Sequence, residues 1–186
     1  MSKQTSIWHH LTAAPHHSMF LVGALQGVMT MLWWVFELVG RYGVFGAPIV
    51  WSVAPTWAHA FLMIYGFLPL FIFGFLFTTY PSWMGGDKIK PSHYIVACSL
   101  ITVGVVMFYA GLIADKSIAT YGVTVMLVGW CTAFYALLRV LVSAPGNDKR
   151  HARVTSIALG FGCLGVAAYL LWLLTDNWSL LNFSRV

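Results

Sequence analysis

The sequence predicts an all-α protein, a polytopic transmembrane bundle of about five helices. Hydrophobic residues make up 60% of the chain and charged residues only 8%, with a mean hydropathy of +0.81, so a water-soluble globule could not cover itself with polar surface. Several charge-free runs reach the ~20 residues that cross a ~30 Å hydrocarbon core as a helix. The alternation that a transmembrane barrel requires is missing, which leaves helices as the way to satisfy the backbone in lipid.

Five spans follow from these runs. The predicted spans are residues 18–39, 57–80, 92–114, 120–142 and 153–175. The first follows Pro15 and ends before Arg41, and the second lies within the longest charge-free run, residues 42–86. The third opens after Pro91, and a polar connection separates the fourth from the fifth. We therefore expect residues 1–186 to form a single transmembrane domain.

The basic residues predict the orientation. Seven of the ten flank the N-terminal side of the membrane, namely Lys3, Lys88, Lys90, Arg139, Lys149, Arg150 and Arg153, against Arg41, Lys116 and Arg185 on the other. The positive-inside rule then places the N-terminus in the cytoplasm and the C-terminus outside, in a bacterial inner membrane. This bias explains the net charge of +5 without a nucleic-acid partner, since no basic run is interleaved with aromatics. No signal peptide is visible, so we expect the first helix to be retained.

Most histidines fall on the predicted inner side. Six of the seven do so: His9, His10, His16, His17, His93 and His151. His16 and His17 stand at the entrance to the first span, and His93 opens the third. If these spans are neighbours, the imidazoles could converge on copper or haem iron; interfacial anchoring is the alternative. The remaining three inner-side histidines are expected to be solvated loop residues.

His59 is the one histidine inside the long charge-free run. A neutral imidazole kept in such a run is a candidate ligand. Glu37 could accept the second ring N–H of His59 and orient the ring; alternatively it forms a local i,i+4 ion pair with Arg41. A span of about 22 residues rises ~33 Å, so His16 or His17 cannot share a metal ion with His59.

The middle of the second span has its own features. Pro69 cannot donate to the carbonyl of Tyr65, which permits a kink. Aromatic rings follow closely, at Phe67, Phe71, Phe73, Phe75 and Phe77. They could form a wall for a flat macrocycle or simply pack the bundle. The three cysteines fall singly in three spans with no CxxC, so we interpret them as structural.

Three sequence strings resemble one family. They are APHHSMFLVGALQGVMTMLWW, PTWAHAFLMIYGFLPLFIFGFLFTTYPSWMG and RVLVSAPGNDKRHA. Together they resemble the N-terminal half of the NnrS family, polytopic bacterial membrane proteins associated with haem, copper and the response to nitric oxide. The most specific matches are Trp57, His59, Gly66, Phe67, Thr78, Pro81 and Trp83, with Pro15 and His16 as a weaker match.

The resemblance also carries expectations about partners. Members of the family are longer than this chain and carry further helices and histidines. This chain is therefore expected to be an N-terminal half, a half-length relative or one subunit of an assembly. The resemblance implies a membrane protein that binds haem, or haem and copper, in nitric-oxide tolerance or denitrification. His59 would then be a haem or copper ligand from the outer side, and His16, His17 and His93 would be ligands from the inner side. A homo-oligomer or another membrane subunit would supply missing ligands.

Other functions remain open. One is a structural or assembly subunit of a haem-copper oxidase or nitric oxide reductase, for which small-residue strips (Gly104 and Gly111; Gly160, Cys163 and Ala167) suit close helix contacts. A transporter is less favoured because no charge lies deep in a span. Hydrolysis lacks paired carboxylates or a nucleophile with its base, which leaves enzymatic turnover open.

Overall fold

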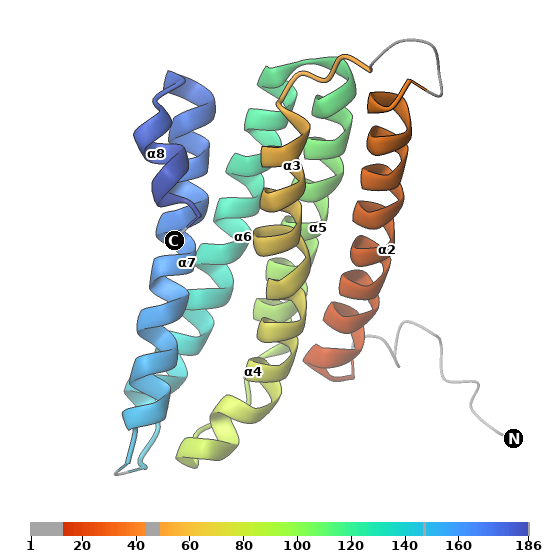
Figure 1. Cartoon of the computed structure of the whole chain (residues 1–186). Coiled ribbons are helices and arrows are strands. Elements are labelled where there is room, and N and C mark those ends of the chain that lie inside the picture. The colour runs from red at the N-terminus through yellow and green to blue at the C-terminus, as the bar shows by residue number, and fades with distance from the viewer. Residues whose placement is uncertain (1–12, 44–48, 147, 186) are drawn as a thin grey trace, which may run out of the picture.

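The computed structural model describes residues 13–43, 49–146 and 148–185, and those residues form helices and connections without a strand (Figure 1). Five helices are long and apolar enough to cross a membrane: α2 (Pro15–Arg41), the composite span Pro55–Met84, α5 (Pro91–Ala114), α6 (Lys116–Ser143) and α7 (Arg150–Thr175). The predicted all-α, five-helix class is confirmed. The orientation of the bundle in the membrane stays a prediction.

Prolines set the starts of three spans. Pro15, Pro55 and Pro91 each stand in the first turn of their helix, where the missing N–H costs nothing and the fixed φ is already helical. The helices therefore begin one to three residues before the predicted starts at residues 18, 57 and 92. His16, His17 and His93 consequently belong to the first turn of a helix.

The second span is built in three segments. The short α3 (Pro55–Phe61) leads into a π-helical segment, η1 (Leu62–Phe67), which continues as α4 (Leu68–Met84). Pro69 lacks the N–H that an α-helix would offer to the Tyr65 carbonyl. The indole Nε1 of Trp130 on α6 donates to that carbonyl instead, at 3.1 Å. The predicted irregularity near Pro69 thus takes the form of a π-helical segment fastened to a neighbouring span.

The connection between α5 and α6 is a single residue, Asp115. Its carboxylate accepts a hydrogen bond from the Ser117 N–H at 2.7 Å and caps α6, so the helix begins at Lys116 rather than at the predicted residue 120. The two helices approach to backbone contact: a Cβ added at Gly104 would lie 2.7 Å from the Gly122 carbonyl oxygen, and one at Gly111 would lie 2.1 Å from the Ala119 nitrogen. The two helices of this hairpin are therefore closely packed.

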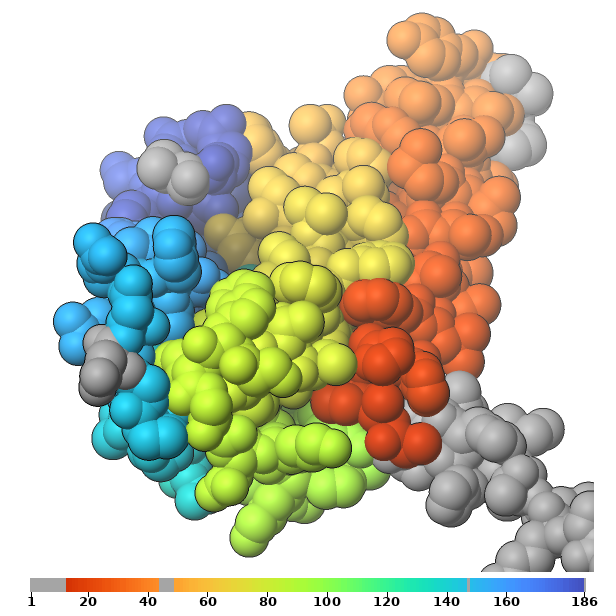
Figure 2. Space-filling model, turned by 90° about the horizontal axis from the view of Figure 1, so that it is seen from below, coloured from red at the N-terminus to blue at the C-terminus, as the bar shows by residue number. Residues whose placement is uncertain are grey.

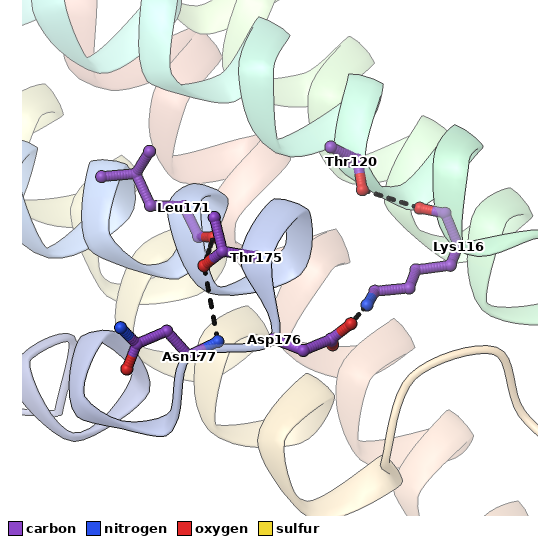
Figure 3. Close-up of polar contacts among 6 residues, drawn as sticks. All are labelled: Lys116, Thr120, Leu171, Thr175, Asp176 and Asn177. Carbon is purple, nitrogen blue, oxygen red and sulfur yellow. Dashed lines mark hydrogen bonds and ion pairs between the residues drawn. The ribbon is translucent and has the colours of Figure 1, made fainter.

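The chain turns back after the last span. Asp176, in the left-handed region at φ 54°, ends α7, and the short α8 (Trp178–Phe183) returns along it (Figure 1). The Tyr65 hydroxyl donates to the Ser184 carbonyl, so the last described residues pack against η1. Lys116 forms an ion pair with Asp176 at 2.6 Å, which joins the start of α6 to the end of α7 (Figure 3).

The first span lies at the edge of the bundle. Only 22% of its most apolar stretch is buried, against 56% of the composite second span. Figure 1 shows α2 as the outermost helix on one side. Its outer face therefore meets lipid or a partner.

Candidate functional site

His59 lies against α2 near one end of the bundle, here called the His59 end. Its ring is half-buried and stacks on Trp34 of α2, with centroids 4.3 Å apart and an interplanar angle of 18°. The Nδ1 atom of His59 is buried and has no hydrogen-bond partner among the described residues. A buried polar nitrogen left in this state costs free energy unless something satisfies it.

Glu37 is the centre of a polar network beside this ring. The side chain is buried, and its Oε1 accepts from Arg41 Nε at 3.1 Å and Nη2 at 2.8 Å. Its Oε2 accepts from Trp51 Nε1 at 2.5 Å. The local ion pair with Arg41, one of the two alternatives for Glu37, is therefore present. In the described structure no hydrogen bond joins Glu37 to His59.

Arg41 connects Glu37 to His59 indirectly. Its guanidinium carbon lies 5.6 Å from the centroid of the Trp34 ring, and the same ring stacks on His59. A cation over an indole face is attracted by the ring quadrupole. Glu37 thus holds Arg41, Arg41 lies over Trp34, and Trp34 fixes the plane of the imidazole.

The segment before α3 closes this end of the bundle. The Trp51 ring packs edge-on against Trp33, with centroids 5.5 Å apart. Ser52 is tied to α5 twice: its hydroxyl donates to the Gly111 carbonyl at 2.7 Å, and its N–H donates to the Leu112 carbonyl at 3.0 Å. Trp51 is therefore held in place from the α5–α6 hairpin, and Glu37 with it.

At the opposite end, here called the His93 end, the histidines contact different helices. His16 and His17 form an edge-to-face pair with centroids 4.4 Å apart, and His16 Nδ1 lies 3.1 Å from the Thr78 hydroxyl on α4. His93 lies 6.5 Å, ring to ring, from Tyr135 on α6. The rings of the sequence neighbours His16 and His17 contact each other, and His16 also contacts α4. His93 instead has its ring contact with Tyr135 on α6.

No complete metal site is present in the residues that the structure describes. No group of three or more His, Cys, Asp or Glu side chains there is arranged to hold a metal ion. Trp34, which stacks on His59, is 18 residues (34 − 16) from His16 along α2, a rise of about 27 Å. The candidate ligands therefore lie at two separate places, one at the His59 end and one at the His93 end. His151 is exposed, in line with a solvated loop residue; His9 and His10 lie outside the described residues.

A buried polar cluster in mid-bundle was not predicted. Gln26 on α2 donates to the Thr30 hydroxyl at 3.0 Å, and Thr30 shares a 2.8 Å hydrogen bond with the Tyr109 hydroxyl on α5. The cluster joins the first and third spans, which are therefore neighbours, as the histidine hypothesis required. Gln26, an amide inside an apolar run, was the signal in the sequence.

Two cysteines also meet. The thiols of Cys131 on α6 and Cys163 on α7 are near enough to interact. Their proximity is not evident from the sequence, in which 32 residues (163 − 131) separate them. Antiparallel packing of α6 and α7 explains their proximity.

These features define a class: a polytopic helical membrane protein with histidines at both ends of its spans. The family model described as NnrS protein matches residues 10–185. The chain belongs to the NnrS family, which is linked to nitric oxide, and the resemblance found in its sequence is confirmed. No curated protein and no solved structure matches the chain.

Proposed function

We propose that this protein binds haem in the membrane, with copper as a second metal, and serves nitric-oxide tolerance or denitrification. The observation that carries the proposal is the buried Nδ1 of His59, which lacks a hydrogen-bond partner in the described structure, as does the Nε1 of nearby Trp33. Glu37, Arg41 and Trp51 satisfy one another and leave no group for the imidazole. Membership of the NnrS family supports the link to nitric oxide. Bound haem iron would supply the coordination position for a diatomic gas.

The surroundings of His59 fit such a ligand. Trp34 covers one face of the imidazole and keeps its plane fixed, so the ring loses little further freedom on coordination. Trp33 and Trp51 add apolar surface that suits a flat macrocycle and excludes water. Glu37 keeps Arg41 over Trp34. Glu37 is therefore a positioning residue that acts on His59 through Arg41 and Trp34.

His16, His17 and His93 are the proposed ligands from the other end. Imidazole nitrogen is a common donor for both copper and iron, and the His16–His17 pair offers two rings side by side. Since no group of three ligating residues forms within the described ranges, a second copy of the chain or another membrane subunit would complete each site. In this proposal the chain lies in the bacterial inner membrane with its N-terminus in the cytoplasm.

Absorbance of the purified protein tests the proposal. A Soret band is expected for the wild type, and His59→Ala should remove most bound haem while leaving insertion and yield nearly unchanged. Glu37→Gln should lose only the ~10 to 100-fold in affinity typical of an outer-shell change. His151→Ala, an exposed histidine, is the matched control and should change neither. Full haem content in His59→Ala would refute the site.

A structural or assembly subunit is the second candidate. The exposed apolar face of α2, the least buried span, favours it because such a face suits a neighbouring membrane subunit as well as lipid. A colourless protein that co-purifies with a haem-copper oxidase or nitric oxide reductase would support this candidate over the first.

A further inference from the structure

A pocket of about 200 Å³ lies at the His93 end, between the segment that follows α4, the start of α5 and the last turns of α6. Its lining includes Lys88, Lys90, His93 and Arg139. Figure 2 looks onto this end, where the yellow-green surface lies between the red start of α2 and the cyan region where α6 leads into α7.

The pocket is strongly cationic. Lys88, Lys90 and Arg139 face one carboxylate, Asp87, a formal charge of +2 (3 − 1). None of these three cations takes part in an ion pair within the described ranges; the pairs there use Arg41, Lys116 and Arg150. Three like charges gathered around a single counter-charge repel one another, and a further anion between them relieves that repulsion.

The pocket is also a fixed feature of the fold. The Gly146 N–H donates to the Met84 carbonyl at 3.0 Å, which fastens the end of α4 to the α6–α7 connection. Gly85 turns the chain in the left-handed region at φ 62°, where a glycine carries no strain. A Cβ added at Gly86 would lie 3.0 Å from the Ala144 Cβ, so this segment packs closely on the end of α6. Lys88 and Lys90 therefore follow directly on a stretch of chain that is packed against the end of α6.

The pocket combines a polar nitrogen that lacks a partner with apolar side chains. The Nδ1 of His93 is buried without a hydrogen-bond partner in the described structure, and the N-terminus of α5 has no side-chain cap. The apolar lining from α6 includes Ala136 and the buried Val140, and Tyr135, beside His93, is exposed. An occupant needs an anionic head and an apolar continuation.

We propose that this pocket binds the phosphate headgroup of an anionic phospholipid. Lys88, Lys90 and Arg139 hold the phosphate, the first turn of α5 adds its positive dipole end, and the acyl chains run along the exposed face of α6. Basic pockets between transmembrane helices at a membrane surface have the charge and position for such headgroups. The proposal rests on Lys88, Lys90 and Arg139 and does not require haem, although His93, proposed above as a metal ligand, lines the same pocket.

Native mass spectrometry and titration in nanodiscs test the proposal with the full chain. Wild-type protein is expected to retain phosphatidylglycerol and not phosphatidylcholine. Each cation near an anionic headgroup contributes about fivefold in affinity, so Lys88→Gln with Lys90→Gln should weaken binding about 25-fold and Arg139→Gln about fivefold. The charge-matched control, Arg150→Gln with Arg153→Gln at the same end of the bundle, should leave phosphatidylglycerol binding unchanged.

Three results would overturn the proposal. Equal retention of phosphatidylglycerol by the Lys88/Lys90 variant and the control would show that the pocket does not hold the headgroup. Equal retention of phosphatidylcholine would show that charge does not select the lipid. Displacement of the lipid by millimolar inorganic phosphate would show that the anion is taken from water. Circular dichroism checks that each variant folds. The readout is the retained lipid, and none of the variants changes a histidine proposed as a haem ligand.

Discussion

Gly111 stands where the α5–α6 hairpin is tightest, and Gly111→Ala tests how much this close approach contributes to the stability of the bundle. A Cβ there would lie 2.1 Å from the backbone nitrogen of Ala119 and 2.5 Å from its Cα. Both neighbours are backbone atoms, which cannot rotate away. The connection between the helices is Asp115 alone, so the hairpin has little slack with which to open.

The cost follows from these distances. Ordinary contact between non-bonded heavy atoms needs about 3.5 Å, so the helices would have to part by roughly 1.4 Å (3.5 − 2.1). Overpacking of this size costs up to about 3 kcal/mol. Weakening the Ser52 hydrogen bond to the Gly111 carbonyl adds about 1 kcal/mol, and the higher helix propensity of alanine returns about 1 kcal/mol. We expect a net loss of about 3 kcal/mol in the free energy of unfolding.

Unfolding in mixed detergent micelles, followed by circular dichroism, measures this loss. The matched control is Gly160→Ala on α7, where the nearest atom to a new Cβ is Phe134 Cζ at 3.5 Å, an ordinary contact. That variant should gain up to about 1 kcal/mol from helix propensity. If Gly111→Ala is as stable as Gly160→Ala, the two helices do not approach each other as closely as the structure describes.

Three further predictions concern the bundle. Trp130→Phe should lower the free energy of unfolding by about 1 to 3 kcal/mol, because the Tyr65 carbonyl loses the indole donor; chemical denaturation measures it. The hydrogen bond accepted at the α6 cap holds the pKa of Asp115 below its ordinary value, so its stabilising effect is full above the unfolded pKa of about 4 and is lost as pH falls through the lower folded pKa. Asp115→Asn should keep the cap and lose this acid dependence. Cysteines placed at Ser2 and Asn177 should label from opposite sides with an impermeant reagent, as the N-in, five-span topology requires.

Each of these has its own contrary result. Trp178→Phe, in the exposed part of α8, is the control for Trp130, and equal losses would show that the carbonyl does not depend on the indole. If Asp115→Asn loses stability at the same acid pH as the wild type, other carboxylates cause the acid dependence. Labelling of both cysteines from one side would rule out an odd number of spans. Asn177 is used because Ser184 is buried against η1.

Local sequence properties were enough for the helical class. Whether a segment partitions into lipid depends on its own length and composition, so all five spans were found. Their starts were placed late by one to four residues because hydropathy does not register the prolines of the first turn or the Asp115 cap. These signals were in the sequence, at Pro15, Pro55, Pro91 and Asp115.

The candidate site was only partly predictable. His59 was identified from the sequence because an imidazole inside a charge-free run is unusual, and the ion pair of Glu37 with Arg41 follows from their i,i+4 spacing. Trp51 as the second partner of Glu37, and Trp34 as the ring stacked on His59, were not predicted. Both contacts depend on how the segment before α3 returns across α2.

The sequence by itself determined that this is a five-span membrane protein with a histidine held in apolar surroundings, because those properties belong to single segments. Only the tertiary structure decided that Gly104 and Gly111 are used inside the chain, against α6, rather than against a partner. It also decided that Tyr65 and Trp130, distant in sequence, satisfy one another. Pairing between helices depends on the register and rotation of both, which no single segment encodes.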